Sequence, residues 1–291
     1  MSGPPIESIR RFNRAVGRHL GAMDDRFLGR DRPMGQARLL WEIGPEGADL
    51  RSLRARLGLD SGYLSRLVRS LEEDGMVTTA PSLQDGRIRR AELTAAGLAE
   101  RSVLDDRSDH LARTLLEPLT ERQRTDLVDA MSTVERLLTA SSVEIRAVDP
   151  AHPDATGCLG PYREELERRT GRDPSTSLPV ADESIRPPTG QNLVAYLAGD
   201  PIGSGALKGG AIPEIKRLWV SETARGLGVG RRLMDALERA ASEASATHVR
   251  LDTNRALSEA TAMYRKRGYA EVAAYNDEPM SDLWMEKALE R

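Results

Sequence analysis

Three glycines stand at alternate positions in the stretch RGLGVGRR, between a strand-like run of residues and an amphipathic helical one. They are Gly226, Gly228 and Gly230. Glycine lets the backbone adopt conformations that other residues disfavour, and it lets the backbone approach an anion closely. A helix that begins in such a turn presents unpaired backbone N–H groups and a partial positive charge. The stretch therefore predicts a strand–turn–helix unit whose turn binds phosphate oxygens.

The elements around this turn predict a β-α-β unit. A strand is expected over 211–220, a helix over 228–244 and a second strand over 247–253. The turn is no Walker loop, because the Gly-Lys-Ser/Thr sequence is absent. It also fits G-x-G-x-x-G poorly, because Leu233 occupies the place of the third glycine. The other elements expected in this half are strands at 141–148, 192–199 and 201–208 and a helix near 159–170.

The residues from Arg225 to Gly230 match R/Q-x-x-G-x-G/A, so this half resembles the GNAT family of acetyl-CoA-dependent N-acetyltransferases. The stretch EATAMYRKRGYAEV resembles the family's A…Y…GF segment, with Tyr264 at the tyrosine position. The resemblance covers about residues 142–291. It implies that the turn binds the pyrophosphate of coenzyme A. It also implies that the strand THVRLDT diverges from its neighbour, leaving a gap for the pantetheine arm.

The same resemblance implies roles for individual residues. Tyr264 is the expected general acid for the leaving thiolate, since a phenol with a pKa of about 10 is a fair donor to it. Glu214 is the expected base, with binding of the substrate ammonium or capping of a strand as alternatives. A backbone N–H near Val220 is the expected oxyanion donor. The residues expected to bind the coenzyme are Leu218, Trp219, Val220, Arg225, Gly226, Leu227, Gly228, Val229, Gly230, Arg231 and Asn254, the last standing in for an Asn that the family often has near Leu257.

The N-terminal half predicts a DNA-binding module. Two helices, over 49–59 and 60–75, are joined by GLDS, which is the spacing of a helix-turn-helix. A β-hairpin with its turn at Asp85-Gly86 follows and makes the module a winged helix. The second helix is expected in the major groove and the hairpin tip in the minor groove. The residues expected to contact DNA are Ser61, Tyr63, Ser65, Arg66 and Arg69 on the helix and Arg87, Arg89 and Arg90 in the hairpin.

The helix pair followed by DGRIRRAELTAAG resembles the MarR family of winged-helix transcription regulators over about residues 5–140. The resemblance implies a homodimer, a palindromic operator in double-stranded DNA and a response to a small ligand. The flanking helices dimerise in that family. They are expected here over 6–28, 34–44, 94–116 and 120–138.

Length and composition set the remaining bounds. A chain of 291 residues suggests about two domains. The net charge of −3 excludes a basic domain, so any nucleic-acid surface has to be a local patch. Cys158 is the one cysteine, which excludes an intrachain disulfide and a zinc-cysteine site, and we expect no metal. No long apolar run and no signal peptide are found, so we expect a cytoplasmic protein without a membrane partner.

We therefore expect a multidomain α + α/β chain. Residues 1–140 would form a winged helix-turn-helix with dimerisation helices, and residues 141–291 a GNAT mixed β-sheet flanked by helices. The expected function is a transcription regulator fused to an acetyltransferase that uses acetyl-CoA on a small primary amine, whose pocket the segment 160–190 would shape. Two alternatives stay open. The second domain is an acyl-CoA sensor with little turnover, or the first domain only dimerises.

Overall fold

The computed structural model describes residues 3–19, 27–29, 31–81, 89–174 and 182–289. It divides the chain into two compact units, Met1–Ala130 and Met131–Arg291, each of which is described by itself. The division falls inside one helix, α6 (Glu121–Ser141). No helix within the described ranges combines the length and the apolarity needed to cross a membrane.

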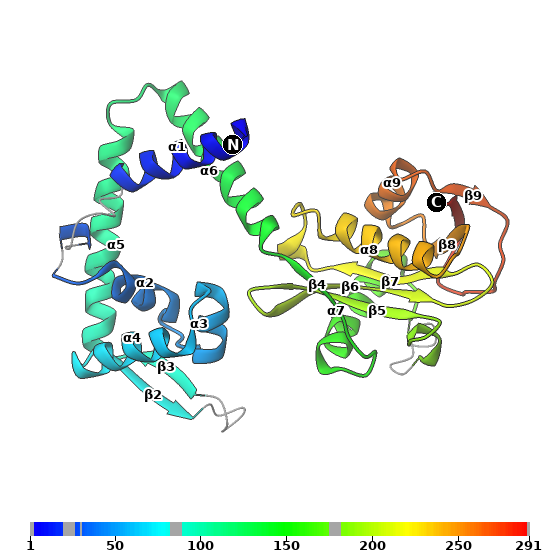
Figure 1. The fold of residues 1–291 in the computed structure, drawn as a ribbon, viewed down its shortest axis with the longest axis horizontal. Helices are drawn as coiled ribbons and strands as arrows, with labels where there is room; N and C mark the ends of the chain where they lie inside the picture. The colour runs from blue at the N-terminus through cyan, green and yellow to red at the C-terminus, as the bar shows by residue number, and fades with distance from the viewer. Residues whose placement is uncertain (1–2, 20–26, 30, 82–88, 175–181, 290–291) are drawn as a thin grey trace. The chain divides into compact units, whose positions relative to one another are not determined.

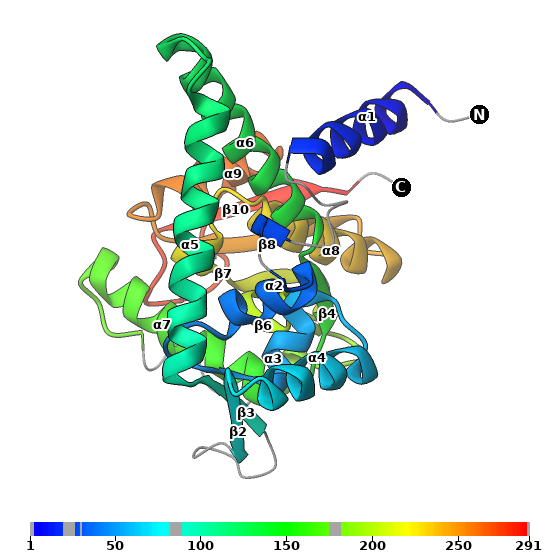
Figure 2. The same cartoon turned by 90° about the vertical axis from the view of Figure 1, so that its left-hand side faces the viewer.

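The first unit is a winged helix with additional helices (Figure 1). Its small antiparallel sheet has the strand order β1-β3-β2. Leu39, Leu40, Leu53, Leu71 and Leu104 are fully buried in its core. In Figure 2 the strands β2 and β3 extend beside α4, at one end of the long α5. The elements are α1 (Pro4–His19), η1 (Phe27–Gly29), α2 (Met34–Ile43), β1 (Ala48–Asp49), α3 (Leu50–Leu57), α4 (Ser61–Glu73), β2 (Val77–Pro81), β3 (Arg89–Leu93) and α5 (Ala95–Leu116).

Residues at the helix ends explain why these helices begin and end where they do. Asp60 caps α4, because its side chain accepts a hydrogen bond from the Tyr63 N–H at 2.8 Å. Thr94 caps α5 by accepting from the Gly97 N–H at 3.1 Å. Gly58 ends α3 in the left-handed region, with φ of 62°. Two side-chain caps and a glycine in the left-handed region thus delimit these helices.

The second unit is one seven-stranded mixed sheet between helices. Its order is β4-β5-β6-β7-β8-β10-β9, and every described neighbour pair is antiparallel except β7 and β8. α8 packs on one face and α7 on the other (Figure 1). The elements are β4 (Glu144–Ala147), α7 (Pro153–Thr170), η2 (Glu183–Ile185), β5 (Gln191–Leu197), β6 (Asp200–Lys208), β7 (Glu214–Val220), η3 (Glu222–Ala224), α8 (Val229–Glu243), β8 (His248–Thr253), α9 (Ser258–Lys266), β9 (Ala270–Val272) and β10 (Leu283–Ala288).

One helix begins earlier than the sequence predicted. α7 starts at Pro153 and not near residue 159, with His152 as its cap, accepting from the Asp154 N–H at 3.2 Å. Its first half contains Gly157, Gly160 and Pro161, which are poor helix formers. Packing of the apolar face against the sheet therefore outweighs the local propensity here.

Two irregularities shape the middle of the sheet. In β7, Arg217 and Leu218 stand opposite the single residue Gly205, and Arg217 has φ of 57°, which is a β-bulge. Next to it, the parallel pairing of β7 with β8 comprises Glu214 with Arg250 and Ile215 with Leu251. The two strands part beyond these residues. The strand divergence that the GNAT resemblance implied is therefore present.

Packing on the opposite face sets the chemistry of Cys158. Its thiol is 2 % exposed, in a small cluster with Val194 and Tyr196. Burial raises its pKa to about 11, although a hydrogen bond with Ser204 acts in the opposite direction. A raised pKa keeps the thiol protonated at neutral pH, which makes it a poor nucleophile.

We therefore expect iodoacetamide at pH 8 to alkylate Cys158 at least about 100-fold more slowly in the folded protein than in urea, because the thiolate fraction falls with the raised pKa. Mass spectrometry of the intact chain over time measures both rates. Equal rates in the two states would contradict the burial of this thiol.

Candidate functional site

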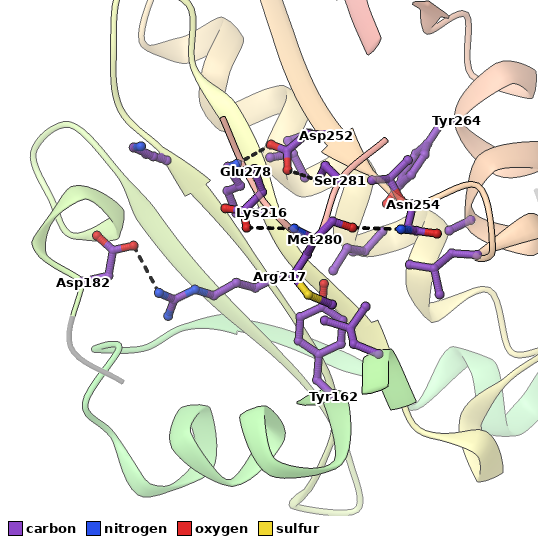
Figure 3. A pocket seen from close by; sticks show the side chains of 17 residues that line it. Tyr162, Asp182, Lys216, Arg217, Asp252, Asn254, Tyr264, Glu278, Met280 and Ser281 are labelled. Carbon is purple, nitrogen blue, oxygen red and sulfur yellow. Dashed lines mark hydrogen bonds and ion pairs between the residues drawn. The ribbon is translucent and has the colours of Figure 1, made fainter. Parts of the chain in front are cut away.

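A cavity of about 180 Å³ lies where β7 and β8 part (Figure 3). Its walls come from α7, β7, the end of β8, α9 and the segment that precedes β10. The described residues that line it are Tyr162, Leu166, Asp182, Lys208, Ile215, Lys216, Arg217, Leu218, Asp252, Thr253, Asn254, Leu257, Ala260, Tyr264, Glu278, Met280 and Ser281.

The bulge in β7 explains how one strand contributes so much of this wall. In a regular strand, successive side chains point to opposite faces. Here the four consecutive residues Ile215 to Leu218 all line the cavity, because the extra residue at Arg217 re-aims the chain. A Cβ at Gly205, opposite the bulge, would lie 3.0 Å from Leu237 Cδ1 and 3.3 Å from Leu218 Cδ1, so a side chain there would require these leucines to shift.

One wall of the cavity is a network around a buried carboxylate. Asp252 is 5 % exposed and accepts hydrogen bonds from Lys216 and from Ser281 Oγ, the latter at 2.6 Å. Lys216 Nζ also lies 3.3 Å from Glu214 Oε2. Burial alone would lower the pKa of Lys216, but the charges of Asp252 and Glu214 outweigh it and the net shift is upward. Lys216 is therefore held as an ammonium and is unsuited to act as a base.

A second charged pair lies at another wall. The guanidinium of Arg217 is 6 % exposed and donates to Asp182 Oδ2 at 3.1 Å (Figure 3). Burial lowers the pKa of Arg217, and Asp182 counteracts this in part. Burial raises the pKa of Asp182, but hydrogen bonds from Ser184 and the charges of Arg217 and Lys208 outweigh it, so that its pKa lies below the ordinary value. Arg217 and Asp182 are thus both charged at neutral pH.

Two phenols face this cavity from opposite helices. Tyr264 on α9 is 6 % exposed, and Tyr162 is contributed by α7. Burial raises the pKa of Tyr264, and the nearby Tyr162 and Asp252 raise it further. Its ring also packs against Tyr269, with centroids 5.9 Å apart. A raised pKa keeps the Tyr264 phenol protonated, so at neutral pH it is a proton donor and not a base.

The glycine turn between β7 and α8 has room for an anion. Gly226 and Gly228 have φ of 81° and 75°, and a Cβ built on either meets no atom within 4 Å. The Arg232 N–H donates to Gly228 O at 3.0 Å in the first turn of α8, and the N–H groups just before it are those that a helix start leaves unpaired. This arrangement fits a pyrophosphate, since the backbone donors and the helix dipole both favour negative charge.

The side chains predicted to bind the coenzyme take several positions. Arg225 donates to Glu165 Oε2 at 2.7 Å, and Trp219 Nε1 donates to the same oxygen at 3.1 Å. Arg231 is exposed on α8. Asn254 is buried at the cavity and donates to Met280 O at 2.9 Å. The part that these side chains play in coenzyme binding stays a prediction.

The predicted catalytic residues differ in their positions. Tyr264 lines the cavity, whereas Glu214 is absent from its described lining and lies behind Lys216. The sequence reasoning missed Tyr162, Arg217, Asp252 and Glu278, all of which line the cavity. The strand THVRLDT did predict a buried strand, and the alternation along it could have singled out Asp252 as an acid at its end. The bulge at Arg217 has no comparable signal.

The helix predicted to enter DNA presents the predicted side chains. On α4 the apolar residues Leu64, Leu67, Val68 and Leu71 are buried. The predicted contact residues Ser61, Tyr63, Ser65, Arg66 and Arg69 are all exposed. Arg66 stacks over the Tyr63 ring, with its guanidinium carbon 5.6 Å from the centroid. The helix thus has one face in the core and an opposite face with two arginines and three hydroxyls.

The wing arginines do not all point outward. Arg90 donates to Glu46 O and lies 3.4 Å from a Glu92 oxygen and 3.8 Å from an Asp49 oxygen, so it braces the sheet. Arg89 donates to Thr79 on the neighbouring strand. Arg87 and the predicted turn at Asp85-Gly86 lie outside the described residues.

Comparison with known proteins identifies both units. Residues 158–269 match the acetyltransferase (GNAT) family, and residues 29–88 match the MarR family. The chain is 36% identical over 134 residues to a protein named IAA acetyltransferase from Azospirillum brasilense, with 43% of this chain and 87% of that protein covered. It is 26% identical over 111 residues to the HTH-type transcriptional repressor IacR from Pseudomonas putida, with 38% of this chain and 66% of the repressor covered.

Solved structures include an acetyltransferase of the GNAT family from Staphylococcus aureus Mu50. It is 17% identical, with a TM-score of 0.42, and the match covers 51% of this chain and 99% of that one. The sequence relationships carry the assignment, since the acetyltransferase from A. brasilense is covered over most of its length. The chain belongs to the GNAT acetyltransferase family and is a fusion of such a domain with an N-terminal MarR-family winged helix.

Proposed function

We propose that the second unit transfers an acetyl group from acetyl-CoA to a small primary amine, and that the first unit binds double-stranded operator DNA as a homodimer. The cavity between β7 and β8 is the observation that carries the first part. It combines a buried phenol, Tyr264, with acidic side chains, and it is lined by the middle of β7, the strand that leads into the glycine turn. Gly226, Gly228 and the N–H groups at the start of α8 would hold the pyrophosphate.

In the reaction the amine nitrogen loses two protons and the thiolate gains one, and the cavity offers residues for these transfers. The acceptor ammonium loses a proton, its nitrogen bonds to the acetyl carbon, and the carbon–sulfur bond breaks. The nitrogen then releases a second proton, and the thiolate takes one up, so the products are an N-acetyl amine, a thiol and one proton. Tyr264 is the proposed donor to the thiolate, because burial keeps its phenol protonated.

Two carboxylates are candidates for binding and deprotonating the amine. Glu278 lines the cavity, and its Oε1 accepts a long hydrogen bond of 3.5 Å from the Met280 N–H. Glu214 reaches the cavity only past Lys216, whose ammonium lies 3.3 Å from it. We propose that Glu278 contacts the amine directly. Glu214 as the base stays a prediction, and a proton would have to reach it through a water molecule or through Lys216.

The exposed side chains of the first unit and of α6 support the DNA-binding part. Arg66 and Arg69 stand on the exposed face of α4, where arginine suits guanine and phosphate. Large apolar residues are exposed on two helices, which a partner chain would cover. They are Ile6, Ile9 and Phe12 on α1 and Leu127, Val128, Met131, Leu137 and Leu138 on α6.

A sensor of acyl-CoA without turnover is the second candidate function. The fusion to a MarR-family unit favours it, since regulators of that kind respond to ligands. A measurement of turnover separates the two functions, because a sensor needs binding at the glycine turn but no proton donor.

The glycine turn is tested by a matched pair of variants. Gly228→Asp and Gly228→Asn add side chains of the same size, and both residues tolerate a positive φ. We expect Gly228→Asp to raise the Kd of acetyl-CoA at least about tenfold above that of Gly228→Asn, because it adds a negative charge where the pyrophosphate is proposed. Isothermal titration calorimetry measures both. Equal affinities, unchanged from the parent protein, would place the pyrophosphate elsewhere.

The proton donor is tested by Tyr264→Phe. We expect kcat for acetyl transfer to fall at least about tenfold, because the thiolate loses its acid, while the Kd of acetyl-CoA stays within about twofold. Release of free thiol, followed with a chromogenic disulfide, measures turnover. An unchanged kcat would remove Tyr264 from the mechanism, and no turnover in the parent protein with any primary amine would favour the sensor.

The DNA-binding helix is tested by Arg66→Ala and Arg69→Ala, with a duplex selected by the parent protein from a random library. Loss of a base contact is expected to weaken binding about tenfold. Loss of a phosphate contact is expected to lower the salt slope by about one. Arg113→Ala on α5, also an exposed arginine of the first unit, is the control. Identical titrations for all variants would exclude α4 as the reading helix.

A further inference from the structure

We infer that the acceptor is an amino acid, an amine that also carries a free carboxylate, and that Lys208 and Arg217 bind this carboxylate while Asp252 and Glu278 face the amine. The inference rests on the proposed acetyl transfer and names its acceptor. It follows from the presence of charges of both signs in one small cavity. A simple amine would pair with the acidic side chains and leave the basic ones without a partner on the substrate.

One end of the cavity carries an excess of positive charge. Lys208 and Arg217 line it together with one carboxylate, Asp182. Asp182 is already bound by Arg217 and by the Ser184 backbone N–H at 3.0 Å. Lys208 forms no hydrogen bond or close ion pair with any residue of the described part of the chain, although its charge contributes to the lowered pKa of Asp182. A half-buried ammonium at the wall of a cavity attracts an anion from solution, because water screens it less than on the open surface.

The other end carries an excess of negative charge. Asp252 and Glu278 line it together with one cation, Lys216. Lys216 is shared between Asp252 and Glu214, so its charge is compensated before a substrate arrives. The carboxylate of Glu278 accepts only a long hydrogen bond from the Met280 N–H, at 3.5 Å, among the described residues. This end therefore favours an ammonium over a neutral group.

The order of these groups fits the direction of the reaction. In Figure 3, Arg217 extends toward Asp182 and away from Tyr264, whereas Asp252 lies on the side of the cavity where its charge acts on Tyr264. An acceptor with its carboxylate at Arg217 would therefore bring its amine to the side of Tyr264. That is the side on which the thioester must be attacked if Tyr264 protonates the departing thiolate.

The size and the apolar walls narrow the acceptor further. The cavity of about 180 Å³ is smaller than the roughly 300–1,000 Å³ of sites for drug-sized ligands. Leu166 and Met280 pack together at its wall, with Tyr162 and Leu257 beside them. These side chains suit an apolar substituent. A single amino acid with an apolar side chain matches the small volume, the apolar wall and the charges of both signs.

Matched acceptors test the inference on the full-length protein. L-Leucine, L-leucinamide and 3-methylbutylamine share one side chain, and only L-leucine carries a carboxylate. L-Phenylalanine, its amide and phenethylamine form a second series of the same kind. The other common amino acids and ω-amino acids complete the panel. We expect kcat/KM for the best amino acid to exceed that of its amide and of its decarboxylated amine at least tenfold. The amide has the less basic amine, so a preference for the acid cannot come from a larger neutral fraction of the amine.

The variant Lys208→Met keeps the length of the side chain and removes its charge. We expect it to raise KM for the preferred amino acid about tenfold with kcat changed less than about threefold, and to lower the ratio of amino acid to amide by the same factor. Lys266→Met, an exposed lysine at the end of α9, is the control and is expected to leave that ratio unchanged.

The outcomes separate this inference from the function on which it rests. If the amides or decarboxylated amines react as well as the amino acids, the acceptor is a simple amine and the inference is wrong, while acetyl transfer stands. If no amine in the panel is acetylated, acetyl transfer itself fails and the inference fails with it. If Lys208→Met keeps the full preference for amino acids, the assignment of the carboxylate to Lys208 is wrong.

Discussion

The parallel pairing of β7 with β8 governs the chemistry of the second unit, because it stops after Ile215 and Leu251. Had it continued, the backbone groups of both strands would be satisfied by each other and no cavity would exist between them. The bulge at Arg217 lies close to this point, in the pairing of β7 with β6, and adds a residue to the wall. Strand divergence and bulge together convert the middle of a sheet into a lined pocket, while the sheet on either side stays regular.

Electrostatic compensation determines which groups in this pocket are left for a ligand. Lys216 and Asp252 are mutually bound, and Glu214 is also paired with Lys216. Burying a pair of this kind costs desolvation free energy, which the attraction between the two charges mostly offsets. The pair therefore fixes the positions of the side chains in the wall and adds little net stability. The groups that have weaker contacts in the described structure, Lys208 and Glu278, are those a substrate would meet. Lys208 and Glu278 bear opposite charges, and for this reason the same cavity can select against amines without an acid group.

The sequence predicted the parts of this structure that rest on local signals. Asp60, Gly58 and Thr94 act at helix ends through their own backbone neighbours, and the helices they delimit were predicted. The glycine turn and Tyr264 were predicted from a motif. Arg217 and Tyr162 were missed, because their places at the cavity depend on a bulge opposite Gly205 and on α7 packing, which no local pattern encodes. The early start of α7 at Pro153 was missed for the same reason, since tertiary packing outweighs its glycines.

One interaction relates the proposed coenzyme site to the helix that both units share. Arg232, in the first turn of α8, donates to Ala140 O at 2.9 Å and to Val143 O at 2.7 Å. Its cation thereby satisfies a carbonyl at the C-terminal end of α6, where the helix dipole favours positive charge. α6 runs from Glu121 to Ser141 across the division between the units. Coupling between two sites requires an element whose arrangement both ligands bias. In this chain α6 continues from one unit into the other, and Arg232 at the start of α8 binds its C-terminal end.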